Sequence, residues 1–414
     1  MKLNRLFILS AALLEFSAIA HAQSLAAIFT NAAPAAAVHT TIPRRSSIIF
    51  IECHGLALGD LSCYGQTNFQ TPNLDRLAAE GMRFTDYRVA STDLPLAQAA
   101  LMTGQNAVFE PGETTLARRL QQAGYRTLLL GEWALGPQPW TQGFDEFVGF
   151  LNSDEGKNYY ADYLWRYSPN YFYNQATSQW SEWKKEYGPN NGGKEMLFPN
   201  TGGKHGQYLP DLFMTALANF VRVNQPDAAN HYRPFFLLVN LPAPRTATTG
   251  RADFPVPTDA PFTGENWPQA AKNRAALITR LDDGIGRLFE QLHKLGMTNN
   301  VAIFFTSATG PEKFADTNLN FLKLGGEARG EKPEAGLRVP MIVRWPEHVP
   351  AGRVNSVPWS TADFAPTALE IAYADPVAGF SGISILPALL GRPGTNSPVL
   401  PNRLEVPARP LQKP

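Results

Sequence analysis

The chain has 414 residues, of which 44% are hydrophobic, and this is enough apolar material for one large α/β domain or two smaller ones. Lysine plus arginine and aspartate plus glutamate each number 36, so no net charge draws nucleic acid or another anionic polymer to the whole surface. A site for an anion must therefore be local, and no nucleic-acid partner is expected.

The N-terminus has the features of a secretory signal peptide. Two basic residues, an apolar stretch over residues 6–14 and the small-x-small pattern Ala20-His21-Ala22 follow one another in the order that signal peptidase requires. The apolar stretch is too short to span a bilayer, and no later stretch is long and apolar enough to do so. We expect cleavage after Ala22 and a secreted or periplasmic mature chain without a membrane span.

Composition divides the remaining chain into three parts. Residues 23–45 are rich in Ala, Thr and Pro without sustained periodicity, which predicts a mobile leader. Residues 46–390 carry the patterns of a globular domain. Residues 391–414 form a Pro-rich tail.

Apolar runs and helical patterns alternate along the globular domain. Residues 47–51 form a continuous apolar run, as expected for a strand that is buried on both faces of a parallel sheet. Residues 71–81 begin with a capping Thr and a Pro and end with a Gly, which predicts a helix. The other expected helices are 94–102, 115–123, 211–223, 270–295 and 361–371, and the other expected strands are 127–130, 235–239, 301–305 and 341–343. This alternation predicts a doubly wound α/β domain whose mainly parallel central sheet is flanked by helices.

Residues 151–206 interrupt this pattern with an insertion rich in Tyr, Trp, Asn and Gly. Clustered aromatic rings can stack on sugars, but they more often close a small subdomain over a core. We therefore favour packing over sugar binding for this insertion.

Cys53 and Cys63 are the only cysteines, which excludes a disulfide scaffold and allows at most one bridge. Two buried free thiols fit so short a separation as well as one bond does. The sequence leaves both possibilities open.

Seven short segments follow one another in an order that is characteristic of one protein family, although each alone is a weak signal. They are GDLSCYG (59–65), TPNLDRL (71–77), GFDEF (143–147), PFFL (234–237), LDD (281–283), FTS (305–307) and RVPMIVRWP (338–346). In these segments the chain resembles the arylsulfatase-like sulfatases of the alkaline phosphatase superfamily. The family's smaller C-terminal sheet domain is expected to be missing, because only the Pro-rich tail follows GISILP (382–387).

The resemblance implies a specific chemistry for an active member. Carboxylates at the C-terminal ends of sheet strands hold a divalent cation, usually calcium, and beside it a Cys or Ser is oxidised to formylglycine, whose hydrate attacks sulfur. Lys, Arg and His neutralise the sulfate oxygens and protonate the leaving group.

The metal ligands of the family are replaced in this chain. The first Asp-Asp pair falls on His54 and Gly55, and the later Asp-Asn pair falls on Ala308 and Thr309. The resemblance therefore implies that no metal is held here, and calcium is not expected as a cofactor.

The nucleophile motif is also replaced. Counting back from the segment AALMTG (99–104) places Leu94 at the nucleophile and Gln98 at the arginine of the motif, whereas anchoring on Pro95 places Asp93 at the nucleophile. Neither Leu94 nor Asp93 can become formylglycine.

The remaining positions of the family site have changed as well. Glu132 stands where the sulfate-binding Lys is found, and Ala134 stands where the neighbouring His is found. Arg245 replaces the His that follows Ala-Pro, and Arg329 aligns with the Lys before the Arg-Val-Pro segment. No catalytic residue is therefore expected.

Two alternatives concern the emptied site. Glu52 and His54 point to one face of the first strand and could hold an ion, although two ligands make a poor site. Glu132 could instead form an ion pair with Arg245 or Arg329 and fill the vacated pocket.

These replacements favour a pseudoenzyme that has kept the sulfatase scaffold. We expect a binding or accessory factor in sulfated-glycan metabolism, with a sulfated carbohydrate or another secreted protein as its partner. The competing hypothesis is a divergent hydrolase of sulfate or phosphate esters in which Thr92 or Asp93 acts without formylglycine. A decayed protein with no selected ligand is a third possibility that the sequence leaves open.

Overall fold

The computed structural model describes residues 45–110, 112–152, 154–156, 158–168, 194–200, 202, 204–246, 254–312, 336–375 and 379–392. The chain separates into two compact units, Met1–Arg44 and Arg45–Pro414, and only the second contains described residues. The predicted signal peptide, nearly all of the leader, the tail beyond residue 392, the middle of the insertion and Arg329 therefore lie outside the described residues.

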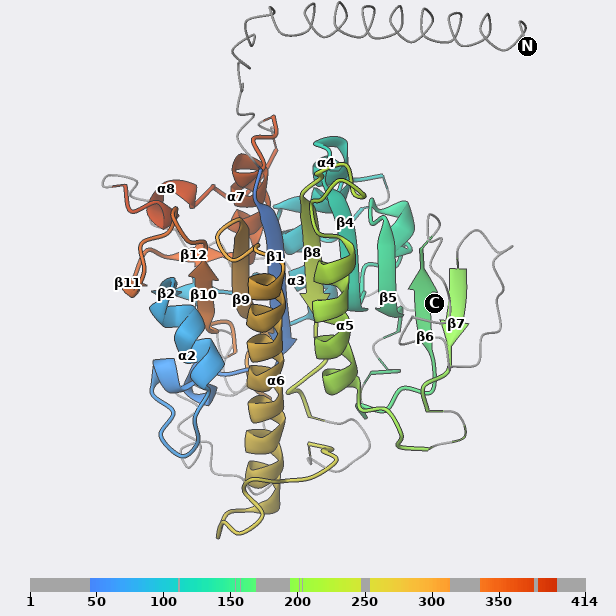
Figure 1. The fold of residues 1–414 in the computed structure, drawn as a ribbon, viewed down its shortest axis with the longest axis vertical. Helices are drawn as coiled ribbons and strands as arrows, with labels where there is room; N and C mark the ends of the chain where they lie inside the picture. The colour runs from blue at the N-terminus through green and yellow to red at the C-terminus, as the bar shows by residue number, and fades with distance from the viewer. Residues whose placement is uncertain are drawn as a thin grey trace, which may run out of the picture. The chain divides into compact units, whose positions relative to one another are not determined.

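A ten-stranded sheet runs through the unit Arg45–Pro414 (Figure 1), with the strand order β11-β2-β10-β9-β1-β8-β4-β5-β6-β7. Its five central strands are parallel: β9 (Val301–Thr309), β1 (Ser47–His54), β8 (Phe235–Asn240), β4 (Arg126–Glu132) and β5 (Glu146–Phe150). The sheet is therefore mainly parallel, as the alternation of strands and helices predicts.

Shorter strands extend the sheet on both sides of this parallel centre. On one side β10 (Met341–Arg344) runs antiparallel to β9, and β2 (Met82–Phe84) and β11 (Arg353–Asn355) follow it. On the other side β6 (Leu164–Tyr167) and β7 (Lys194–Leu197) continue antiparallel from β5. A separate parallel pair is formed by β3 (Tyr87–Arg88) and β12 (Trp359–Ser360).

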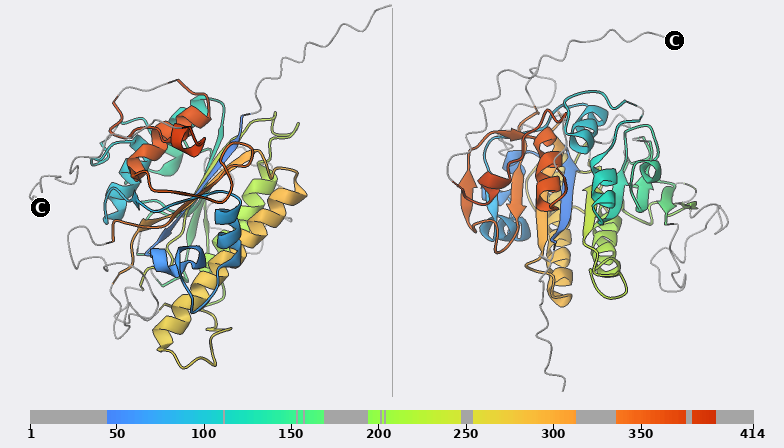
Figure 2. Two further views of the ribbon diagram at one scale, coloured as in Figure 1. Left: turned by 90° about the vertical axis from the view of Figure 1, so that its left-hand side faces the viewer. Right: turned by 90° about the horizontal axis from the view of Figure 1, so that it is seen from above.

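Helices cover both faces of the sheet (Figure 2). One face carries α2 (Pro72–Ala79), α5 (Leu209–Val223) and α6 (Gln269–Lys294), and the other carries α3 (Leu94–Thr103), α4 (Leu116–Gln122) and α7 (Phe364–Ile371). A short helix, α8 (Leu386–Leu389), packs beside α7. No described helix combines the length and apolar character that a bilayer crossing needs.

The strand β1 shows why the sheet can separate two cores. Ile49 and Ile51 contribute to the core beneath α2, α5 and α6, whereas Ile48 and Phe50 contribute to the core beneath α3, α4 and α7. Successive side chains of a strand point to opposite faces, so the part of a strand that helices cover on both sides is apolar at successive positions. This confirms the interpretation of residues 47–51.

A side chain of α6 fixes the start of α2. Asp282 accepts hydrogen bonds from the backbone nitrogens of Asn73 and Leu74 at 3.1 and 2.8 Å and from Asn73 Nδ2 at 2.9 Å. The first amides of a helix have no partner within the helix, and this carboxylate supplies one from a neighbouring helix. The segments TPNLDRL and LDD are therefore in direct contact.

The structure decides the question of the two cysteines, because Cys53 and Cys63 are both free. Among the described aromatics of the insertion, Tyr159 and Tyr160 are buried in the core, which agrees with the packing role that we favour, whereas Tyr163 and Trp165 are half-buried.

Candidate functional site

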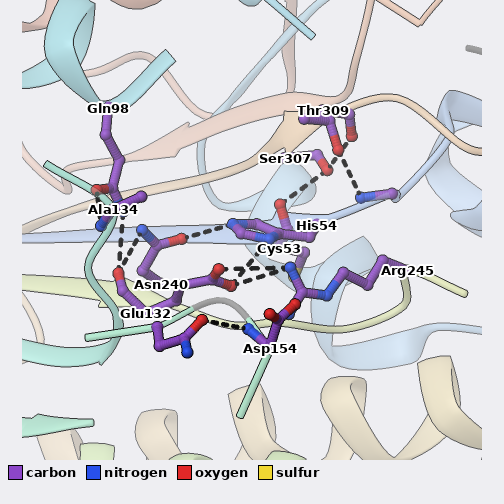
Figure 3. Close-up of polar contacts among 12 residues, drawn as sticks. Cys53, His54, Gln98, Glu132, Ala134, Asp154, Asn240, Arg245, Ser307 and Thr309 are labelled. Atoms are coloured by element: carbon purple, nitrogen blue, oxygen red, sulfur yellow. Dashed lines mark hydrogen bonds and ion pairs between the residues drawn. The ribbon is translucent and has the colours of Figure 1, made fainter. Parts of the chain in front are cut away.

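Polar side chains meet where three of the central strands end. His54 is the last residue of β1, Glu132 of β4 and Asn240 of β8, and Arg245 follows β8 (Figure 3). The carboxyl ends of parallel strands lie along one edge of a sheet, which is where ligand sites of such sheets are found. All three strand-end side chains are buried.

Asn240 determines which nitrogen of His54 carries a hydrogen. Its Nδ2 donates to the backbone oxygen of Glu132 at 2.9 Å, so its Oδ1 faces His54 Nε2, which lies 2.9 Å away and must donate. Burial lowers the pKa of His54 to about 4, against a smaller opposing effect of the Glu132 charge. The buried ring is therefore neutral with its hydrogen on Nε2, and Nδ1 presents a lone pair to Glu132 Oε2 at 3.4 Å.

Glu132 and Arg245 form a buried ion pair. Arg245 Nη1 lies 3.2 Å from Glu132 Oε2 and 3.4 Å from Oε1, while the side chains of Arg245 and Glu132 are 12% and 0% exposed. The predicted ion pair between Glu132 and Arg245 is therefore confirmed. The second partner considered, Arg329, lies outside the described residues.

Gln98 ties α3 to the end of β4. Its Nε2 donates to the backbone oxygen of Glu132 at 2.9 Å, and its Oε1 accepts from the backbone nitrogen of Ala134 at 2.8 Å. The oxygen and the nitrogen of this buried amide are thus both used within the protein. The carbonyl of Glu132 receives donors from Gln98 and Asn240, which fixes the backbone beneath the carboxylate.

Glu52 lies two residues before His54 and on the same face of β1. Its Oε1 is buried and has no hydrogen-bond partner among the described residues. Burial, helped by the nearby charge of Glu132, raises the pKa of Glu52 to about 8. A neutral Glu52 is a poor metal ligand, and the described part of the chain contains no group of three or more His, Cys, Asp or Glu that could hold an ion.

The comparisons with known proteins place the chain in a family. The family model for sulfatases matches residues 47–374. The chain belongs to the sulfatase family.

Characterised sulfatases are similar to the chain over most of its length. N-acetylgalactosamine-6-sulfatase of the dog, Canis lupus familiaris, is 28% identical over 395 residues, which cover 86% of this chain and 68% of that enzyme. Human arylsulfatase A is 29% identical over 390 residues, covering 86% of this chain and 70% of that enzyme.

The crystal structure of Ps i-CgsB in complex with k-i-k-neocarrahexaose superposes with a TM-score of 0.64 at 26% identity, covering 84% of this chain and 76% of that one. The sheet and its helices are thus those of sulfatases of known structure.

The positions of the sulfatase metal ligands do not suit a calcium ion in this chain. Ala308 has no ligating side chain, and Thr309 Oγ1 accepts from the backbone nitrogen of Gly55 at 3.2 Å. Gly55 has a φ of +79°, and a Cβ added there would lie 3.1 Å from the Cα of Arg245. Calcium takes six to eight oxygen ligands, whereas these positions offer one imidazole nitrogen, a hydroxyl that already accepts a hydrogen bond, and no carboxylate.

The start of α3, where sulfatases carry the nucleophile, has a structural role here. Asp93 is the N-cap of α3, and its Oδ1 accepts from the backbone nitrogen of Leu96 at 3.2 Å. Leu94 is the first residue of the helix and has no nucleophilic atom. Asp93 is exposed, and no described contact joins it to His54 or Glu132.

Sequence reasoning identified four of the five residues of this site but missed Asn240 and the hydrogen bonds of Gln98. A signal for Asn240 did exist, because it is the polar residue that directly follows the apolar run 235–239. No local pattern announces the two hydrogen bonds of Gln98, whose partners lie 34 and 36 residues away.

Proposed function

We propose that this chain is a non-catalytic member of the sulfatase family that acts as a binding or accessory protein in sulfated-glycan metabolism. The observation that supports this most strongly is the closed contact set of His54, Glu132, Asn240 and Arg245 at the strand ends. In it, side chains that replace the metal ligand, the sulfate-binding Lys and a His bind one another. A hydrolase of the family's kind needs these positions open toward substrate and metal.

The relatives support the glycan part of the proposal. The curated relative N-acetylgalactosamine-6-sulfatase is named for a sulfated amino sugar, and Ps i-CgsB was crystallised with a neocarrahexaose. We extend from them only the class of partner, a carbohydrate that occurs in sulfated form. Secretion through residues 1–22 belongs to the same proposal.

Two measurements on the purified chain test the loss of catalysis. Metal analysis should find well below one equivalent of calcium, because no carboxylate remains at the family's ligand positions. Hydrolysis of an aryl sulfate should not exceed the buffer rate, with an active sulfatase assayed in parallel. One equivalent of calcium together with turnover would overturn the proposal.

The divergent hydrolase is the second candidate, and the exposed carboxylate of Asp93 at the start of α3 is the observation that favours it. It predicts turnover of a sulfate or phosphate ester that Asp93→Ala abolishes. Asp283→Ala, which removes an exposed carboxylate from α6, serves as the matched control and should leave that turnover unchanged. Turnover that survives Asp93→Ala would exclude Asp93 as the nucleophile.

A further inference from the structure

The carboxylate of Glu132 lies between the guanidinium of Arg245 and the neutral ring of His54. Its Oε2 faces Arg245 Nη1 at 3.2 Å and the ring of His54 at 3.4 Å, and its Oε1 lies 3.4 Å from the same Arg245 nitrogen. A guanidinium is a strong hydrogen-bonding partner for an oxyanion. In this chain the oxyanion beside Arg245 is the carboxylate of Glu132 itself.

The backbone at Glu132 is held in place, so it cannot shift to carry the carboxylate away from Arg245. Its carbonyl is fixed by Gln98 and Asn240, both at 2.9 Å. The preceding residue, Gly131, has a φ of +110° and is pressed so closely onto β8 that a Cβ would lie 1.9 Å from the backbone oxygen of Asn240. The strand end is therefore locked on both sides, and only the side chain of Glu132 could move.

The other titratable groups around the Glu132 carboxylate do not favour the binding of an additional anion beside it. Glu52 lies on β1 beside Glu132, and Glu312 beyond β9 acts electrostatically on His54. Arg245 is the cation paired with Glu132 here, and His54 is neutral. An oxyanion that entered would have to displace Glu132 from Arg245 and remain beside it, which is repulsive in a buried site.

We propose that Glu132 is the resident anion of this pocket: it occupies the place beside Arg245 and His54 where an oxyanion group would sit, and so excludes sulfate and phosphate groups from this end of the sheet. The inference rests on the proposed function, because a hydrolase of sulfate esters would have to admit the excluded group. It makes Glu132 a specificity-determining residue. A glycan bound here would present a neutral hydroxyl to the pocket.

The test is sulfate binding by the full chain and its variants. Thermal unfolding and titration calorimetry are recorded with sodium sulfate and with sodium chloride at equal ionic strength. The wild type should show no saturable sulfate binding. Glu132→Ala removes both the charge and the volume of the carboxylate, and it should gain saturable binding and a rise in Tm of a few degrees that only sulfate produces.

Two further variants separate charge from space. Glu132→Gln keeps the volume, and its amide can donate to His54 Nδ1, so it should fold and bind sulfate at least about tenfold more weakly than Glu132→Ala. Glu132→Ala/Arg245→Met lacks the cation and should lose the gained binding.

The matched control is Glu146→Ala. Glu146 is likewise a buried glutamate in an ion pair, with Arg126 at 2.5 Å, but it lies at the opposite ends of β4 and β5. This variant should not gain sulfate binding. Sulfate also stabilises proteins generally by its exclusion from their surface, and an equal rise in Tm for Glu146→Ala would reveal that effect and overturn the inference.

The remaining outcomes are equally decisive. Saturable sulfate binding by the wild type without turnover would overturn the inference and leave the proposed function standing. Hydrolysis of an aryl sulfate by the wild type would overturn the proposed function itself. A folded Glu132→Ala that binds no sulfate would overturn the inference. If Glu132→Ala does not fold, sulfate binding by Glu132→Ser, compared with the wild type, tests the inference instead.

Discussion

Two buried arginine–carboxylate pairs stand near the same end of the sheet, and they are built differently. Arg274 meets Asp60 through two nitrogens, with Nε 3.0 Å from Oδ1 and Nη2 2.6 Å from Oδ2, and it also donates to two backbone carbonyls. Arg245 meets Glu132 through the single nitrogen Nη1, at 3.2 and 3.4 Å. The Arg274–Asp60 pair is bidentate, whereas the Arg245–Glu132 pair is not.

This difference separates a structural pair from a candidate site. Arg274 joins α6 to the loops that follow β1 and β8, and Asp60 also accepts from the backbone nitrogen of Ala57, so each charge has several partners. The oxygen of Glu132 that faces Arg245 also faces the lone pair of His54. A pair with long contacts and an unfavourable neighbour can rearrange at lower cost than one with every group satisfied.

The largest effect is expected for Arg274→Met. The substitution leaves Asp60 charged and buried, so we expect the free energy of unfolding to fall by about 3–5 kcal/mol, as for other broken buried pairs. Urea unfolding followed by circular dichroism measures this. Arg76→Met, which breaks an exposed pair with Glu80, is the control and should cost within about 1 kcal/mol.

A smaller effect is expected for Arg245→Met, because the pair that it breaks is the looser one. We expect a loss of about 1–3 kcal/mol in the same urea experiment, within the range for an unsatisfied buried group. If Arg245→Met cost more than Arg274→Met, geometry would not distinguish the two pairs, and the comparison would fail.

The carboxyl group of Glu52 predicts a dependence of stability on pH. Its pKa rises from 4.5 to about 8 on folding, so between these values the folded state binds more protons and stability falls as pH rises. The neutral His54, whose pKa falls from 6.5 to about 4, acts in the opposite direction below pH 6.5. Between pH 6.5 and 8 only Glu52 of these two acts, with a slope of at most about 1.4 kcal/mol per pH unit.

Glu52→Gln should remove that slope, since it cannot ionise. Unfolding free energies of the wild type and the variant at pH 6.5, 7.25 and 8 test this. Parallel curves for both proteins would show that Glu52 is ionised in the folded state.

A reducing agent is expected to have no effect on the Tm. Cys53 and Cys63 are free, so the Tm should be the same with and without dithiothreitol. A thiol titration in denaturant without reductant should find two thiols per chain. A lower Tm in dithiothreitol would indicate a bond that the structure does not have.

The sequence predicted the parts of the fold that carry their own pattern. Strands of the parallel centre are buried on both faces and read as continuous apolar runs, as residues 235–239 do, and α6 has helical periodicity over many turns. The strands β2, β3, β11 and β12, which contain only two or three residues, were missed, and so were β6, β7 and the five-residue β5 of the parallel centre. Pairing with a distant neighbour defines such strands, and no local pattern encodes it.

The same limit applied to the site. The position of Glu132 came from the family motif, and its pairing with Arg245 followed from opposite charges at two positions that converge in sulfatases. The role of Asn240 depends on the register between β4 and β8, which pairs Gly131 with Asn240 and which the sequence does not specify. The loss of metal and nucleophile remains a prediction that the metal and activity measurements must decide.

The turn at Gly55 makes the installation of a calcium site in this chain a concerted problem for protein engineering. An aspartate there would have to adopt a left-handed backbone and push the chain at Arg245 outward by a few tenths of an ångström, and Arg245 is the counter-ion of Glu132. Reinstating carboxylates one at a time would therefore strain the loop before any ion could compensate. A reactivated design would need to change residues 55, 132 and 245 together and rebuild the loop between β8 and α6.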